Sequence, residues 1–128
     1  MKNRYLVKAK KVDNNKWVAG YLSFIYVNGK NENGFIYTDK ACIYSTEDVR
    51  SYDVYTETIC QCTGKKINNE MLFENDIVED HIGFGFIEYV EKYCAFRVNY
   101  YYSTRAKWFY DYLDSEYKSI ERLGNIHD

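Results

Sequence analysis

The chain of 128 residues contains no proline, only seven glycines and four cysteines. Without proline and with so little glycine, it is neither a collagen-like chain nor a proline-rich disordered linker. The four cysteines are too sparse and too irregularly spaced for the disulfide framework of a small secreted domain. The sequence also lacks a signal-peptide-like N-terminus and the run of roughly 18 to 20 apolar residues that a membrane helix requires. We therefore predict a cytoplasmic protein without a membrane partner.

Aromatic residues, in contrast, are abundant, with 15 tyrosines, seven phenylalanines and two tryptophans. The length suits a single domain around one core, and we expect residues 1–128 to form it. The net charge of −2 argues against a nonspecific nucleic-acid binder, which carries a basic footprint.

The N-terminal part shows the alternation that is typical of β-strands. Val7 and Ala9 alternate with Lys8 and Lys10, and the turn-forming residues 13–15 precede a second alternating run, so the pattern predicts a β-hairpin. We predict its strands at 4–12 and 17–24, further strands at 35–37, 41–44 and 58–62, a loop or short helix at 45–55, and a glycine turn at 63–66 that ends the strand before it.

The C-terminal part has three β-rich runs joined by short turns, at residues 77–78, 84–90 and 93–102. Trp108, Phe109, Tyr112, Leu113 and Tyr117 then recur at helical spacing after a cap at Ser103 or Thr104, and residues 119–126 read as a last strand. We predict a mainly β fold with a minor α part. A hairpin region spans residues 1–56, and a small SH3-like β-barrel with one short C-terminal helix spans residues 57–128.

Three stretches, taken in order, resemble the YopX family of phage and prophage proteins. They are Lys8-Ala9-Lys10 with Trp17-Val18-Ala19-Gly20-Tyr21, then Thr58-Ile59-Cys60-Gln61-Cys62-Thr63-Gly64 with Phe73-Glu74-Asn75-Asp76-Ile77-Val78, and Ile120-Glu121-Arg122-Leu123-Gly124-Asn125-Ile126. One departure is Asn68-Asn69, where the family usually has an Asn-Gly turn. The resemblance implies a mostly β fold encoded by a phage or an integrated element, with no established activity and no catalytic residues to transfer.

Two groups of residues are candidate metal ligands. Cys60 and Cys62 share a face of a predicted strand, but without a second close pair we favour buried reduced thiols. The carboxylates of Glu74, Asp76, Glu79 and Asp80, beside His81, have the chemistry of a Mg²⁺ or Ca²⁺ site, although a solvated acidic face is the commoner meaning of such a run. Because no nucleophile, phosphate-loop or zinc-protease motif is present, we predict no enzyme, no cofactor and no catalytic residue.

The tyrosine excess points instead to an interaction surface, because tyrosine is favoured where proteins meet. Trp17 and Tyr21 share a face of the second hairpin strand, where we expect their rings to cover the barrel. We predict a surface that contains Trp17, Tyr21, Tyr100, Tyr101, Tyr102, Tyr110 and Tyr112.

Charge is segregated along the chain. Residues 1–20 contain six basic residues and one acidic residue, whereas residues 70–91 contain seven acidic residues and no basic residue. Such segregation fits docking of the basic hairpin onto the acidic part of the same or a second molecule, and it fits two separately solvated faces equally well. We predict a noncatalytic phage accessory protein of the host-cell cytoplasm that binds a protein or itself as a homo-oligomer. The alternatives are a nucleic-acid-binding module, if Arg97, Arg105 and Lys107 line the tyrosine surface, and a divalent-metal-dependent enzyme.

Overall fold

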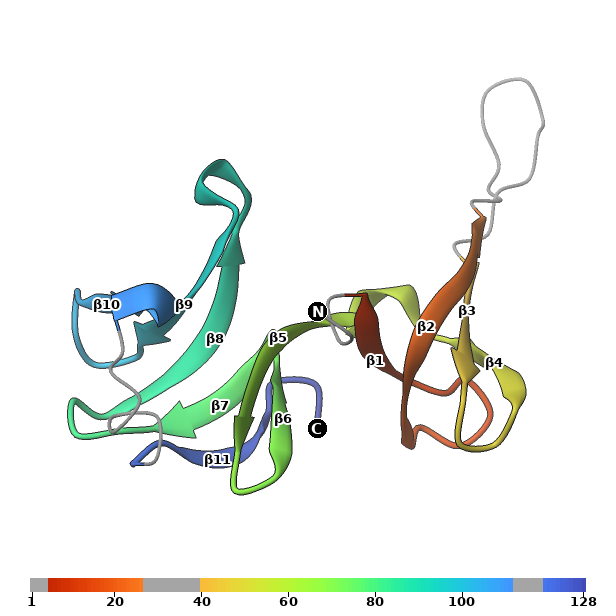
Figure 1. Cartoon of the computed structure of the whole chain (residues 1–128), viewed down its shortest axis with the longest axis horizontal. Coiled ribbons are helices and arrows are strands. Elements are labelled where there is room, and N and C mark those ends of the chain that lie inside the picture. The colour runs from red at the N-terminus through yellow and green to blue at the C-terminus, as the bar shows by residue number, and fades with distance from the viewer. Residues whose placement is uncertain (1–4, 27–39, 112–118) are drawn as a thin grey trace. The chain divides into compact units, whose positions relative to one another are not determined.

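The computed structural model describes residues 5–26, 40–111 and 119–128, and its elements are labelled in Figure 1. The chain divides into two compact units, unit 1 over Met1–Gln61 and unit 2 over Cys62–Asp128. Every strand pair is antiparallel, which confirms the predicted mainly β class. The boundary lies a few residues beyond the one predicted at 56/57, and the assignment of both units to a single domain stays a prediction.

Unit 1 is built on the predicted hairpin. Its strands are β1 (Leu6–Lys10), β2 (Trp17–Tyr26), β3 (Lys40–Ser45) and β4 (Arg50–Val54), and the start of β5 (Cys60–Ile67) pairs with β1. Asn15 in the β1–β2 turn has a φ of 58°, a left-handed conformation that asparagine tolerates well. The predicted strand at 35–37 lies outside the described residues.

The sheet formed by β1 to β4 is curled, so that β4 lies beside the end of β1. Lys11 forms a bridge with Val54, and the Val12 amide donates a hydrogen bond of 3.0 Å to the Asp53 carbonyl. Inside the curl, the side chains of one sheet face form an apolar core: Val7, Ala9, Val18, Ala41, Ile43 and Val54. The predicted loop or helix at 45–55 is therefore wrong over β4, where pairing with β3 sets an extended chain despite the weak apolar pattern.

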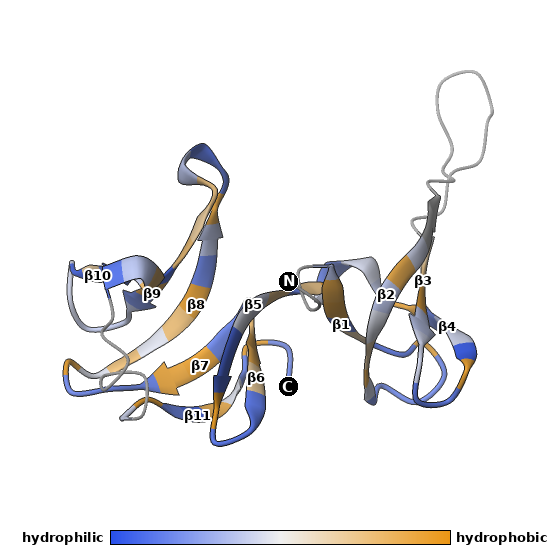
Figure 2. Cartoon of the chain, in the orientation of Figure 1, coloured by the Kyte–Doolittle hydropathy of each residue, from blue (hydrophilic) through white to orange (hydrophobic). Residues whose placement is uncertain are grey.

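Unit 2 contains a five-stranded sheet in the order β10-β9-β8-β7-β11. The strands are β7 (Asp76–Glu79), β8 (Phe84–Val90), β9 (Ala95–Tyr100), β10 (Ala106–Trp108) and β11 (Glu121–Asn125). Figure 2 shows apolar stretches within β7 and β8, where Val78 and Ile87 are buried. They pack with the other core residues of this unit: Ile67, Leu72, Val98, Tyr100, Phe109 and Ile120. The order is open, with β10 and β11 at the edges, so the predicted SH3-like barrel is not closed in the described residues.

The strand predicted at 58–62 does not end at Gly64. A 3₁₀ turn, η1 (Thr56–Thr58), comes first, and β5 then continues to Ile67, with Gly64 at a φ of 80° within an irregular stretch of its pairing with β6 (Glu70–Phe73). The turn between these two strands is Asn68-Asn69, and both residues have positive φ, 52° and 65°. Gly64 therefore lies at a β-bulge, and Asn68-Asn69 form the turn of the β5–β6 hairpin.

The predicted C-terminal helix is also wrong where the structure describes it. Residues Ala106–Trp108 form β10 and pair with Arg97 to Asn99 of β9, and Phe109–Asp111 form a single 3₁₀ turn, η3. Tyr112, Leu113 and Tyr117 lie outside the described residues. Pairing with β9 and burial of Phe109 in the core override the helical spacing of the aromatic residues.

Candidate interaction surface

Three rings and one guanidinium gather on unit 2 around Trp108. The β9–β10 register places Arg97 directly beside Trp108, with the guanidinium carbon 5.3 Å from the ring centroid. Tyr110 of η3 stacks on Trp108 at 5.7 Å and 7° between the ring planes. Tyr93, from the 3₁₀ turn η2 (Glu91–Tyr93), meets it edge-on at 5.4 Å. We call these four residues the Trp108 cluster.

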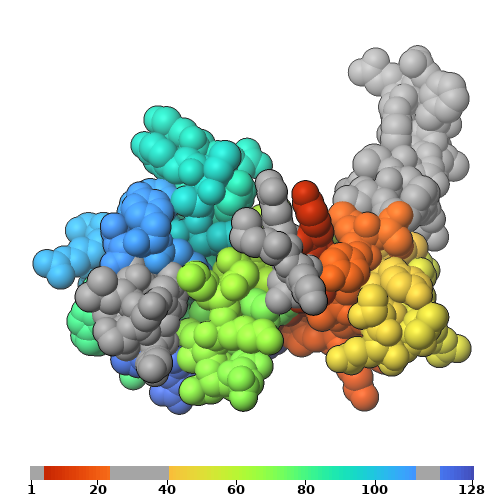
Figure 3. Space-filling view, viewed as in Figure 1, coloured from red at the N-terminus to blue at the C-terminus, as the bar shows by residue number. Residues whose placement is uncertain are grey.

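The cluster is accessible yet held in place. Tyr93 is 59% exposed and Tyr110 is 71% exposed, whereas Trp108 is half-buried between its neighbours. Arg97 Nε lies 2.9 Å from Glu88 Oε2, and this ion pair orients the guanidinium over the indole ring. The β8–β9 turn that carries Tyr93, coloured teal, lies at the surface in Figure 3. The rings are thus held in one arrangement by contacts within unit 2.

The aromatic surface extends along β8 on the side of the sheet opposite the core. Ile87 points into the core, so Phe84 and Phe86 point outward with Glu88. Phe86 packs on Tyr101 with 5.6 Å between centroids, and Phe84 is 43% exposed. Outward apolar rings on a strand next to the Trp108 cluster enlarge the area that a partner can cover.

The five predicted surface tyrosines of the C-terminal part divide into three groups. Tyr101, Tyr102 and Tyr110 are exposed as expected. Tyr100, in contrast, is buried, and its hydroxyl donates a hydrogen bond to the Asp80 carboxylate, so its predicted accessibility is wrong. Tyr112 lies outside the described residues. Consecutive strand residues face opposite sides, and only the β8–β9 pairing decides that Tyr100 is the inward one.

Sequence reasoning missed Trp108 and Tyr93 as surface residues. The pattern places Trp108 in a helix and Tyr93 at the start of a strand, whereas Tyr93 ends the 3₁₀ turn η2, directly before Cys94 with its φ of 48°. The sequence suggests Arg97 only as a phosphate contact, and the structure places it at Trp108, on the same surface as Tyr110. The one sequence signal for an exposed Tyr93 is its position directly after Glu91 and Lys92, where a short turn is predicted.

Trp17 and Tyr21 lie on the outward face of unit 1. They alternate with Val18, whose side chain points into the core, and with the buried Gly20, so both share the face of Lys8 and Lys10. The ammonium groups of Lys8 and Lys10 lie 4.7 and 5.6 Å from the Trp17 ring centroid. The shared face is confirmed, and of its two lysines Lys8 is buried and Lys10 is half-buried.

Two carboxylates of the acidic run at residues 74–80, those of Asp76 and Asp80, have hydrogen-bond partners within unit 2. Asp76 is fully buried and accepts hydrogen bonds from the Phe73 amide and the Asn125 side chain, each at 2.8 Å, and it lies 3.2 Å from Arg122 Nε. The Asp80 carboxylate accepts the Ile82 amide at 2.8 Å. A solvated acidic face is therefore wrong for Asp76, whose charge is compensated internally.

The other metal candidates do not assemble either. Cys60 and Cys62 are buried free thiols, and desolvation raises the pKa of the Cys62 thiol, against a hydrogen bond from the Gly64 amide that lowers it. Within residues 5–26, 40–111 and 119–128, no three His, Cys, Asp or Glu side chains come together as a set of metal ligands.

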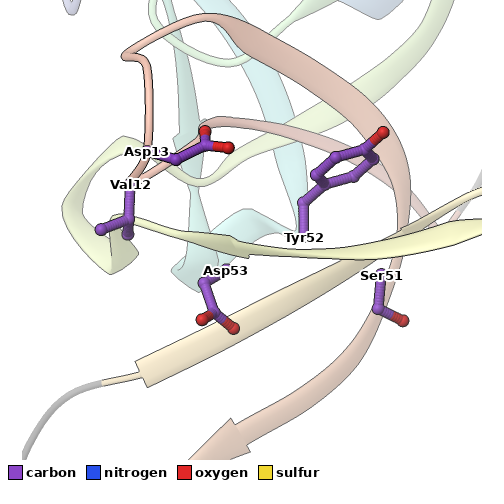
Figure 4. A pocket seen from close by; sticks show the side chains of 5 residues that line it. All are labelled: Val12, Asp13, Ser51, Tyr52 and Asp53. Carbon is purple, nitrogen blue, oxygen red and sulfur yellow. The ribbon is translucent and has the colours of Figure 1, made fainter.

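A shallow hollow of about 310 Å³ lies beside β4 and is lined by Val12, Asp13, Ser51, Tyr52 and Asp53. Figure 4 shows Ser51 and Asp53 pointing to one side of the strand and Tyr52 to the other. The Tyr52 hydroxyl donates a hydrogen bond of 2.7 Å to Asp48, which raises the pKa of the phenol. The Asp53 carboxylate at the edge of the hollow accepts a hydrogen bond of 3.1 Å from the Cys42 thiol.

In the described part of the chain, no helix is long and apolar enough to cross a membrane. No protein-family model matches the chain, and no curated protein matches it.

Proposed function

We propose that this protein is a noncatalytic binding protein that recognises a protein partner through the Trp108 cluster. The observation that carries the proposal is the arrangement of Trp108, Tyr110, Tyr93 and Arg97 on one accessible surface. Tryptophan, tyrosine and arginine are the residue types that dominate binding energy at protein interfaces. A role as a phage or prophage accessory protein in the host-cell cytoplasm is part of the proposal and rests on the resemblance to the YopX family.

The geometry favours a protein partner over a small molecule. The cluster consists of rings in mutual contact, and its two outer tyrosines, Tyr93 and Tyr110, are exposed and present an apolar ring with a polar hydroxyl. Since Trp108 already contacts its neighbours, little side-chain entropy remains to be lost when a partner covers it. The Arg97–Glu88 pair at the margin supplies polar groups of the kind found at an interface rim.

The test uses Tyr110→Ala and Tyr93→Ala, with Tyr102→Ala as the matched control. Tyr102 is 92% exposed and takes no part in the ring contacts of the cluster, so its removal leaves the cluster unchanged. We expect a host protein captured by the wild-type chain to be lost with Tyr110→Ala and retained with Tyr102→Ala. Titration of that protein with the Tyr110→Ala variant should show an affinity about tenfold or more weaker than that of the wild-type chain. A tenfold loss corresponds to about 1.4 kcal/mol.

The partner can also be a second copy of this chain, which light scattering over a concentration series detects. Self-association through the cluster predicts a dimer for the wild-type chain and for Tyr102→Ala, and a monomer for Tyr110→Ala. Equal binding and equal mass for all variants would contradict the proposal. Matching unfolding temperatures for the variants show that any loss arises at the surface and not from unfolding.

A further inference from the structure

Most polar atoms of the Trp108 cluster are unused within the protein. In the part of the chain that the structure describes, the Trp108 indole N–H and the hydroxyls of Tyr93 and Tyr110 form no hydrogen bond, and Arg97 donates only from Nε, to Glu88. No buried side-chain nitrogen or oxygen among the described residues lacks a partner, so Nε1 of the half-buried Trp108 is open to solvent. Tryptophan and arginine can only donate hydrogen bonds. The cluster therefore combines exposed rings with donors that oxygen atoms of a partner can use.

The cluster presents no net charge of one sign. The charge of Arg97 is compensated by Glu88, with 2.9 Å between Nε and Oε2. The exposed charged residues beside the two outer tyrosines are of both signs: Glu91, Lys92 and Asp111. A strongly acidic or strongly basic segment would thus find no surface of complementary charge here. The hydrogen-bond donors and the rings are left to select the partner, and they favour an uncharged segment.

An uncharged segment that fits these donors offers oxygen acceptors and apolar rings, and few N–H groups of its own. Proline-rich segments have this composition, because proline lacks the amide N–H and contributes an apolar ring. In the polyproline II conformation that such segments prefer, the backbone carbonyls form no internal hydrogen bonds and are free to accept. Aromatic surfaces recognise proline-rich segments in this form, and the preformed helix loses little conformational entropy on binding.

The dimensions of the cluster suit a short polyproline II segment. The centroids of Tyr93 and Tyr110 lie 5.4 and 5.7 Å from that of Trp108. A polyproline II helix rises about 3.1 Å per residue, so three or four residues span about 9 to 12 Å and can cover neighbouring rings. The Tyr93 ring stands at 80° to the indole plane and the Tyr110 ring at 7°. Proline rings that project in different directions from the helix can therefore each contact an aromatic ring.

We propose that the Trp108 cluster binds a proline-rich segment of its partner in the polyproline II conformation. Proline rings pack against Tyr93 and Tyr110, and backbone carbonyls of the segment accept hydrogen bonds from Trp108 Nε1 and from the unused N–H groups of Arg97. This inference rests on the proposed function and names the chemistry of the partner. Residues 1–128 contain no proline, so a second copy of this chain cannot supply the segment.

The first test titrates decaproline with blocked ends into nitrogen-15-labelled protein and follows the indole N–H signals by NMR. A blocked glycine-serine peptide of the same length, also uncharged, is the control probe. The Trp108 signal, identified by its absence from Trp108→Phe, should shift with decaproline, whereas the signal of Trp17, which lies in unit 1, should not. The glycine-serine peptide should shift neither signal. No shift of the Trp108 signal with decaproline, or equal shifts with both peptides, would overturn the inference.

The second test uses variants that remove a ring or a donor, with affinity measured from backbone amide shifts. Tyr110→Ala should weaken decaproline binding about fivefold or more, and Tyr102→Ala, at the 92% exposed position, is the matched control. Trp108→Phe keeps an aromatic ring but loses the N–H, and we expect binding about threefold or more weaker. Thermal unfolding of each variant shows that its fold is retained. Wild-type affinity of Tyr110→Ala or of Trp108→Phe would overturn the inference.

The outcome for this inference can be told apart from the outcome for the proposed function. Decaproline should displace the host protein that the wild-type chain captures. Capture that depends on Tyr110, together with no binding of decaproline, would overturn this inference and leave the proposed function standing. Capture that is independent of Tyr110 would contradict the proposed function and, with it, this inference.

Discussion

Arg122 on β11 holds the fully buried carboxylate of Asp76 on β7, with 3.2 Å between Nε and Oδ2. Arg122 also contacts Glu70 at 3.1 Å, and Asn125 donates to the other oxygen of Asp76. Burial lowers the pKa of Arg122, but the hydrogen bond and charge of Asp76 outweigh it, and the pKa lies above its ordinary value. This network joins the start of β7 to β6 and β11, and it explains an acidic residue at the edge of an apolar core.

Removal of the Asp76 carboxylate should therefore destabilise the protein strongly. Asp76→Ala leaves Arg122 and Asn125 without their buried acceptor, and we expect the free energy of unfolding to fall by about 3 to 5 kcal/mol. Urea-induced unfolding measures it. Glu88→Ala, which breaks the partly exposed pair with Arg97, should cost less than about 1 kcal/mol. Similar losses for both variants would show that the Asp76 network contributes no more than a surface pair.

A side chain at Gly20 should not fit. A Cβ atom there would overlap the carbonyl oxygen of Tyr44 and touch Ile43, because β2 and β3 approach closely at this point. We expect Gly20→Ala to destabilise the protein by about 1 to 3 kcal/mol, the usual cost of overpacking. The neighbouring exposed position is the control, and Ala19→Val should stay within about 0.5 kcal/mol in thermal unfolding. An unchanged unfolding temperature for Gly20→Ala would mean that the strands separate at little cost.

The asparagine turn offers a test in the stabilising direction. Asn69 has a φ of 65°, which glycine adopts freely and a β-branched residue adopts only with strain. Asn69→Gly should keep or raise the stability by a few tenths of a kcal/mol, whereas Asn69→Val should lower it by about 1 to 2 kcal/mol. Chemical denaturation of both variants checks the order, and equal stability would argue against the left-handed turn.

The cysteines should differ in reactivity. Cys94 is exposed in the β8–β9 turn, whereas Cys60 and Cys62 are buried. We expect a thiol reagent at about pH 8 to label Cys94 rapidly, and the buried pair only after denaturation, because thiolates are the reactive form and need access. Cys94→Ser should abolish the fast phase. In that variant the half-buried Cys42 is the one native thiol outside the buried pair. Labelling of more than one thiol in the native variant would contradict the burial of Cys60 and Cys62.

The raised pKa of Cys62 also implies a pH dependence. The unfolded chain releases this thiol proton at lower pH than the native chain, so stability is fully present below the unfolded pKa and falls as pH rises through the native one. We expect Cys62→Ala to show a smaller decrease in unfolding free energy between about pH 7 and 10 than the wild-type chain. A decrease of the same size would show that Cys62 retains an ordinary pKa in the folded protein.

Much of the strand content was predictable from local pattern. β8 begins and ends where the apolar alternation does, and the β1–β2 hairpin follows from alternation around an Asn-rich turn. The strands that the pattern misses are β4, β6 and β10, which have three to five residues each. Their sequences show no clear alternation of apolar and polar residues. They are strands because they form backbone hydrogen bonds with a neighbouring strand.

The candidate surface shows the same limit. That the chain has more tyrosine than one core can hold was evident from composition, but which tyrosine is buried was not. Tyr100 points inward and Tyr101 outward because β9 pairs with β8 in one register, and a shift by one residue would exchange them. Trp108 belongs to the surface only because β10 pairs with β9 and thereby places Trp108 beside Arg97.

The sequence by itself determined the β class, the first hairpin and the abundance of rings, because these depend on residue type and on alternation between neighbours. Tertiary structure alone decided the open order of the unit 2 sheet, the burial of Asp76 against Arg122, and the meeting of Tyr93, Trp108 and Tyr110. Those features depend on contacts between residues far apart in the chain, and their energies come from pairing and burial that no short stretch of sequence contains.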